Sequence, residues 1–187
     1  TEIRGGALSI SSDAGGLAQT LAPKVGIVTS WALYFAPATT VLAAMRSNDL
    51  GDLNPVPLAI MSIVSMSWLA YGVSVKDAYV VFSCIGGCIG SIGYVLAILP
   101  LLQHDKPRLR MTQGIMLAGY TITLSLWTFL GLSGASATRI GSVLGMFASV
   151  LFIAFSGSPL STIKSVIATK NSGSILGSLT VAQVLNT

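Results

Sequence analysis

Charged side chains are scarce in this sequence. Ten Lys and Arg and six Asp and Glu make up 9% of 187 residues, whereas 52% of the residues are apolar. Mean hydropathy is strongly positive, at +0.79. A soluble domain usually carries about a quarter charged residues. This shortage argues against an ordinary soluble domain and points to a protein surrounded by membrane lipid.

Groups for acid–base chemistry and metal binding are also few. The chain has one His and six carboxylates, and the carboxylates fall in the expected loops and tail, so no nucleophile–base–acid set can be assembled. Cys84 and Cys88 share a helix face but lack enough partners for a metal site, and they are expected to be small buried thiols. We therefore predict no enzyme activity, no cofactor and no metal. The scattered basic residues predict no nucleic-acid partner.

The few charges leave five long gaps. Windows without Lys, Arg, Asp or Glu cover residues 25–45, 55–75, 78–103, 111–138 and 140–163. A membrane-spanning helix needs about 20 residues, and continuous apolar runs exclude the alternating strands of an outer-membrane barrel. The sequence predicts an all-α membrane protein with five complete transmembrane helices. The shorter stretch 171–187 is expected to begin a sixth.

The distribution of basic residues predicts an orientation. If every window crosses, Arg46, the Lys106–Arg110 group and the Lys164/Lys170 pair share one face, opposite Lys24, Lys76 and Arg139. By the positive-inside rule the N-terminus then lies on the outer or lumenal side. Residues 1–23 form a polar tail without a starting Met, so we expect a processed or cropped chain, with an organelle membrane as one location.

The first and fifth windows resemble each other at an offset of 122 residues. Pro37-Ala-Thr-Thr-Val aligns with Pro159-Leu-Ser-Thr-Ile, and both segments run in the same direction. This predicts parallel repeats in a plan of three helices, a linker helix and three more helices. The second repeat is expected to be incomplete. The predicted units are a tail (1–23), a first three-helix repeat (24–103), a basic loop with the linker helix (104–138) and the incomplete second repeat (139–187).

Glycines and aromatic residues mark helix contacts and membrane interfaces. Gly86-x-x-x-Gly90 and Gly141-x-x-x-Gly145 allow helices to approach closely, and packing within the bundle is favoured over an oligomer face. Trp68 and Tyr71 near the end of a window are typical interfacial anchors.

Several of these motifs, in this order, resemble the SWEET sugar-transporter family. They are Phe35-Ala-Pro37, Pro57, Trp68-x-x-Tyr71-Gly72, Lys76-Asp77 and Ser158-Pro159-Leu160. The resemblance covers about residues 25–180. It implies a SWEET-like fold in which Pro37, Pro57 and Pro159 act as hinges for alternating access. It also implies that Trp68, Tyr71 and Cys84 lie at a cavity or gate, with Cys84 where the family places an Asn.

The expected function is facilitated transport of a small polar solute, with a sugar favoured. No window contains an ionisable Asp, Glu, Lys, Arg or His, which favours a passive facilitator over an ion-coupled pump. One alternative is a non-transporting structural subunit of a larger organellar complex, photosynthetic or respiratory. Another is a carrier of a non-sugar metabolite. A homo-oligomer remains open in each case.

Overall fold

The computed structural model describes residues 3–51, 53–157 and 181 and, within these ranges, contains helices and short connections but no strand. The elements are α1 (Ile3–Phe35), α2 (Ala38–Ser47), α3 (Pro55–Val75), α4 (Ala78–Ile98), the 3₁₀ helix η1 (Leu99–His104), α5 (Lys106–Leu132) and α6 (Ala137–Ser156). The all-α prediction is confirmed.

Within the described residues, five helical segments are long and apolar enough to cross a membrane. They are Gln19–Ser47, Pro55–Val75, Ala78–His104, Lys106–Leu132 and Ala137–Ser156. The prediction of five spans is therefore confirmed. The expected sixth span, 171–187, lies outside the described residues apart from residue 181.

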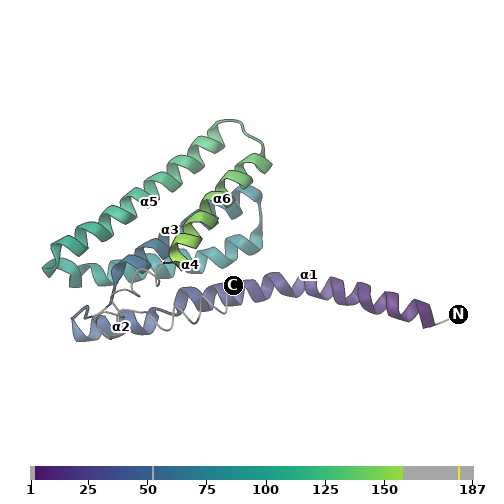
Figure 1. Cartoon of the computed structure of the whole chain (residues 1–187), viewed down its shortest axis with the longest axis horizontal. Coiled ribbons are helices and arrows are strands. Elements are labelled where there is room, and N and C mark those ends of the chain that lie inside the picture. The colour runs from purple at the N-terminus through teal and green to yellow at the C-terminus, as the bar shows by residue number, and fades with distance from the viewer. Residues whose placement is uncertain (1–2, 52, 158–180, 182–187) are drawn as a thin grey trace.

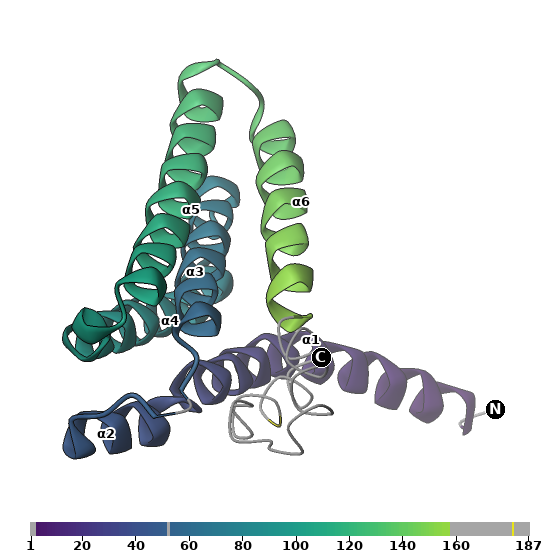
Figure 2. The ribbon, with the colours of Figure 1, turned by 60° about the vertical axis from the view of Figure 1, so that its left-hand side comes forward.

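Helix α3 occupies the centre of the bundle. It packs against α4, α5 and α6, whereas α1 packs against α4. The third span, α4, therefore lies between the first span, α1, and the second span, α3. Helices α5 and α6 form a hairpin joined by a short loop (Figures 1 and 2). The matching arrangement in a second repeat stays a prediction.

Helix α1 extends well beyond the first span. Its 33 residues correspond to roughly 50 Å, against a hydrocarbon core of about 30 Å, and its N-terminal part projects past the bundle (Figure 1). Residues 3–23, expected to form a tail, are thus helical. Because no proline precedes Pro23 in this stretch, the helix can continue backwards from the span.

The first span is broken at Pro37, as its sequence predicts. Helix α1 ends at Phe35, and α2 resumes at Ala38. The Ala36 N–H still donates to Ala32 O and the Val41 N–H to Pro37 O, both at 3.0 Å. Proline has no N–H of its own and crowds the preceding turn. The break is therefore local, and helical bonding continues on both sides.

Side-chain caps define where the later helices begin. Asn54, Asp77, Asp105 and Ser136 each accept a hydrogen bond from a backbone N–H in the first turn of α3, α4, α5 and α6. Such caps satisfy N–H groups that have no partner within the helix.

One cap changes the reading of the basic segment. Because Asp105 caps α5, accepting from Arg108 N at 3.2 Å, Lys106, Arg108 and Arg110 lie in the first turns of the linker helix instead of a loop. An exposed ion pair joins Arg108 to Asp105 at 3.2 Å. The linker helix also ends at Leu132, before the predicted limit of 138, because Gly134 turns the chain with φ +68° and Ser136 starts α6.

The apolar core gathers at one end of the bundle, where α3 begins and α4 and α6 end. Leu58, Ile98 and Phe155 are at most 1% exposed there and belong to one contiguous cluster with Val41 and Val95. We call this the closed end. The opposite end, where α3 ends and α4 and α6 begin, is called the open end.

Glycines and hydroxyl groups bring the helices together. Beta carbons added at Gly86 and Gly145 would meet Trp31 at 3.0 Å and Tyr71 at 3.1 Å, and one at Gly141 would meet Val75 at 2.6 Å. The glycine patterns therefore serve packing within the bundle at these positions.

The linker helix is attached to α3 by polar contacts. Ser67 Oγ and Thr123 Oγ1 lie 3.1 Å apart, and Trp127 Nε1 donates to Ser74 Oγ at 3.0 Å. Such interhelical bonds are typical of membrane bundles, because lipid offers polar groups no alternative partner.

Candidate functional site

A cavity of about 280 Å³ lies between α1, α3, α4 and α6. We call it the central cavity. Its lining residues are Ser30, Leu33, Tyr34, Trp68, Val80, Ser83, Cys84 and Phe152. They come from four helices that are far apart in the sequence, so the cavity exists only in the packed bundle.

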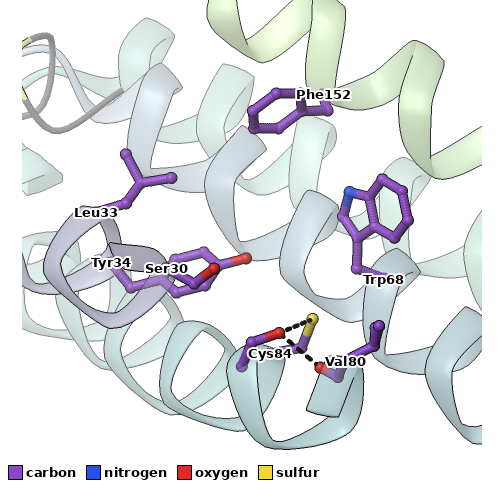
Figure 3. Close-up of a pocket in the computed structure, with 8 residues that line it drawn as sticks. Ser30, Leu33, Tyr34, Trp68, Val80, Cys84 and Phe152 are labelled. Carbon is purple, nitrogen blue, oxygen red and sulfur yellow. Dashed lines mark hydrogen bonds between the residues drawn. The ribbon is translucent and has the colours of Figure 1, made fainter. Parts of the chain in front are cut away.

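Aromatic rings form much of the wall of the central cavity. Figure 3 shows Trp68, Tyr34 and Phe152 on different sides of the space, with the Cys84 thiol pointing toward it. Tyr34 is 7% exposed and Phe155, one turn below Phe152, is 1% exposed. Flat apolar rings with a few polar groups between them are the usual lining of a small-molecule site.

The polar groups of the central cavity are all neutral. Ser83 Oγ donates to Val80 O at 2.8 Å and lies 3.7 Å from Cys84 Sγ, as the dashed lines in Figure 3 mark. The Tyr34 hydroxyl and the Trp68 indole N–H have no hydrogen-bond partner among residues 3–51 and 53–157. Both groups are thus available to a solute.

Local sequence explains how α4 presents its side chains. Asp77 Oδ1 accepts from the backbone N–H of Tyr79 and Val80, at 2.9 and 3.2 Å, which sets the start of the helix. Ser83 and Cys84 then follow within two turns. The caps and the helical repeat together direct both side chains toward α1 and α3.

A glycine on α4 makes room for Tyr34. A beta carbon at Gly87 would lie 2.5 Å from Tyr34 Cζ, so any side chain there would displace the ring. One turn toward the start of α4, Trp31 Nε1 donates to Phe82 O at 3.1 Å. These two contacts hold α1 against α4 and fix the ring that lines the cavity.

A second hollow lies toward the open end, between α3 and α6. Its volume is about 470 Å³, and its lining includes Trp68, Tyr71, Thr138 and Ser149. Trp68 lines both spaces. Its ring meets Tyr71 edge to face, with centroids 5.5 Å apart and planes at 86°. The pair therefore forms the wall between the central cavity and the open end.

The structure places the predicted site residues in three different settings. Cys84 and Trp68 line the central cavity and Tyr71 lines the second hollow. Trp68 is half-buried and faces these spaces, and its expected role as a membrane-interface anchor stays a prediction.

The predicted hinge prolines lie at different positions relative to their helices. Pro37 separates α1 from α2, whereas Pro57 lies in the first turn of α3, where backbone N–H groups have no helical partner to lose. Of these two prolines, Pro37 alone interrupts a span. Pro159 lies outside the residues that the structure describes.

Sequence reasoning missed Ser30, Tyr34 and Phe152. Ser30 and Tyr34 are one helical turn apart and share a face of α1. That spacing is a signal that could have identified them, since both sit just before Pro37. Phe152 carries no comparable signal, because nothing in its largely apolar window sets it apart from its neighbours.

In the described part of the chain no charged side chain lines the central cavity, and no group of three His, Cys, Asp or Glu gathers to hold a metal. Neutral donors and aromatic walls suit a neutral solute. The fold and the cavity together define an integral helical membrane protein with an uncharged internal site.

Comparisons with known proteins relate this chain to one family of transporters. The family described as "Sugar efflux transporter for intercellular exchange" matches residues 23–106. "Sugar transporter SWEET1" of Rattus norvegicus is 24% identical over 177 residues, which is 93% of this chain and 77% of the relative. The protein of the same name from Homo sapiens is also 24% identical, over 92% of the chain and 76% of the relative.

A plant relative also matches. "Bidirectional sugar transporter SWEET8" of Arabidopsis thaliana is 27% identical over 152 residues, or 79% of this chain and 63% of that protein. No solved structure gives a significant match. The chain is similar to the SWEET family over residues 23–106 and to SWEET transporters over most of its length. The resemblance inferred from the motifs is confirmed, and the relatives that match are named as transporters.

Proposed function

We propose that this protein is a facilitator that moves a small neutral solute, in the first place a sugar, across a membrane by alternating access. The observation that carries the proposal is the central cavity: it is aromatic, uncharged and formed by α1, α3, α4 and α6. The relatives are named as sugar transporters, which favours a sugar as the solute.

The two ends of the bundle suggest how access alternates. The central cavity is bounded toward the closed end by fully buried apolar side chains and toward the open end by Trp68 and Tyr71. In the proposed cycle Trp68 and Tyr71 act as the gate of the open end. Pro37 acts as the hinge by which α2 moves relative to α1, since a broken helix bends at low cost there.

Uptake into proteoliposomes tests the proposal. Purified protein is reconstituted and the entry of labelled D-glucose, D-fructose and sucrose is followed, with protein-free liposomes and heat-denatured protein as controls. We expect protein-dependent uptake that saturates with solute concentration and needs no ion gradient. Absence of uptake for every sugar would overturn the proposal.

The alternative function is that of a structural subunit in a larger membrane complex. The observation in its favour is α1, whose N-terminal part projects past the bundle and offers surface to a partner (Figure 1). Native gels after mild solubilisation separate the two functions. Migration only as a monomer or homo-oligomer contradicts the structural role.

A further inference from the structure

Basic side chains gather where α5 begins. Lys106, Arg108 and Arg110 fall within five residues, although the whole chain of 187 residues has ten Lys and Arg. The start of α5 lies at the closed end of the bundle, as does α2 with Arg46 (Figures 1 and 2). The positive-inside rule assigns such an end to the cytoplasmic side, where the membrane surface is anionic.

The length of α5 indicates how deep these charges lie in the membrane. The helix has 27 residues, or roughly 40 Å, against a hydrocarbon core of about 30 Å. Its charge-free part, residues 111–132, is about 33 Å long and can cross the core by itself. Residues 106–110 are therefore expected at the level of the lipid headgroups.

Two of the three cations lie on a face of α5 that leads to lipid. Thr123 and Leu130 mark the side that packs into the bundle, at 0% and 7% exposed. Lys106 and Arg110 are one helical turn apart on another face, and both are exposed. Leu117, which is 72% exposed, continues that face two turns further along α5. One face thus offers cations at the headgroup level and hydrocarbon below them, as a phospholipid requires.

The charges of Lys106 and Arg110 are not compensated by the described residues. Arg108 pairs with Asp105 at 3.2 Å, whereas the other two cations have no ion pair in the described part of the chain. Residues 158–187 contain no Asp or Glu. Like charges at i and i+4 repel each other, and cations are unfavourable near the start of a helix. An anion held between the two side chains would remove this cost.

We propose that Lys106 and Arg110 bind the headgroup of an anionic phospholipid whose acyl chains lie along α5 over Leu117. The phosphate would accept hydrogen bonds from the Arg110 guanidinium, which suits bidentate contact, and from the Lys106 ammonium. The lipid anchors the closed end of the bundle at the membrane surface. The inference is independent of the proposed transport, because a structural subunit would bind the lipid in the same way.

The first experiment counts bound lipid. Delipidated protein in a nonionic detergent receives equal amounts of phosphatidylglycerol and phosphatidylcholine with identical acyl chains, and native mass spectrometry measures which lipid stays bound. We expect phosphatidylglycerol to be retained about fivefold to thirtyfold more, the effect of one to two basic side chains at an anionic surface. Equal retention would overturn the inference. Displacement of phosphatidylglycerol by inorganic phosphate would show a site for a free anion and would also contradict it.

A double variant tests the two residues. Lys106→Gln with Arg110→Gln should abolish the preference for phosphatidylglycerol, a loss of about fivefold for each charge removed. Arg139→Gln is the matched control, because Arg139 is likewise an exposed cation in the first turn of a spanning helix, α6, at the open end. It should change the preference by less than about twofold. Equal losses in both proteins would contradict the assignment to Lys106 and Arg110.

Thermal unfolding separates lost lipid binding from a damaged fold. Without lipid, the double Gln variant should unfold at the same or a higher temperature than the unchanged protein, since the repulsion between two cations is gone. Phosphatidylglycerol at a hundredfold excess over its dissociation constant should raise the unfolding temperature of the unchanged protein by about 5–10 °C.

A charge-preserving variant completes this measurement. Lys106→Arg with Arg110→Lys keeps both cations and should keep most of the gain from phosphatidylglycerol, whereas the double Gln variant should lose it. A gain of equal size in all three proteins would refute the proposed lipid site.

Discussion

The closed end and the open end of the bundle are built from the same helices but pack differently. At the closed end Leu58, Ile98 and Phe155 are almost completely buried, and apolar side chains of α2, α3, α4 and α6 meet directly. At the open end Trp68 and Tyr71 border a hollow lined by hydroxyl-bearing residues. The difference indicates that stability is concentrated where the spans meet tightly, and the proposed access to the central cavity lies where they do not.

The largest effect is expected from emptying the closed end. Phe155→Ala removes a ring that is 1% exposed and should lower the free energy of unfolding by about 3–5 kcal/mol, since a cavity is left behind. Thermal unfolding in detergent measures the change. Phe129→Ala on α5, where the ring is 70% exposed, is the control and should change little. Equal effects would show that the closed end is not the stabilising region.

A smaller loss is expected where α1 contacts α4 beside the central cavity. The beta carbon of Gly87→Ala would lie 2.5 Å from the Tyr34 ring, and such overpacking costs about 1–3 kcal/mol. Gly93→Ala in the same helix has nothing within 4 Å of its beta carbon. It should be neutral or slightly stabilising, because Ala favours helix more than Gly. Matching losses in both variants would mean that Tyr34 does not require the glycine.

At the open end, function should suffer more than stability. Trp68→Ala removes the ring that lines both hollows and should reduce sugar uptake by about tenfold. Trp68→Phe keeps an aromatic face and loses only the N–H donor, whose hydrogen bond is worth about 0.5–1.5 kcal/mol. Initial uptake rates at several sugar concentrations distinguish the two. Trp127→Phe on α5 is the control. An unaffected rate in Trp68→Ala would remove Trp68 from the pathway.

The two prolines provide a further comparison between regions. Pro37→Ala restores a backbone N–H donor at the break between α1 and α2. It should slow the exchange of sugar across the membrane by about twofold to tenfold without lowering thermal stability, because a continuous helix bends less readily. Pro57→Ala lies in the first turn of α3 and should matter less. Counterflow rates and thermal unfolding measure both quantities. A larger effect from Pro57 would contradict the assignment of the hinge to Pro37.

The smallest effect concerns pH. Among the described residues, no Asp, Glu, Lys, Arg or His lines either hollow, so none of the described lining residues is a group that usually changes charge between about pH 5 and 8. Uptake driven by a sugar gradient should then vary less than about twofold over this range. A steep pH dependence, or stimulation by a proton gradient, would indicate coupling to a group outside the two hollows.

Much of the fold could be predicted because its signals are local. The absence of charge marks each span, and Asp77 and Asp105 accept hydrogen bonds from backbone N–H groups at the helix starts. The break at Pro37 follows from a missing donor. The extension of α1 through residues 3–23 was not foreseen, because a polar Gly- and Ser-rich composition does not exclude a helix.

The cavity could be predicted only in part. Cys84 and Trp68 were selected through the family resemblance, and the structure places both at one space. Phe152 was not selected, because an apolar residue in an apolar window looks the same whether it faces lipid or a cavity. Only the position of α6 against α3 separates these cases.

By itself the sequence determined that the protein is helical and membrane-embedded, where its spans lie and where the first one bends, since charge, capping and proline act within a few residues. The tertiary structure decided which side chains share a space. It placed Tyr34 over Gly87, and it put Trp68 between the central cavity and the open end. That outcome depends on the packing of helices distant in sequence, which no local pattern contains.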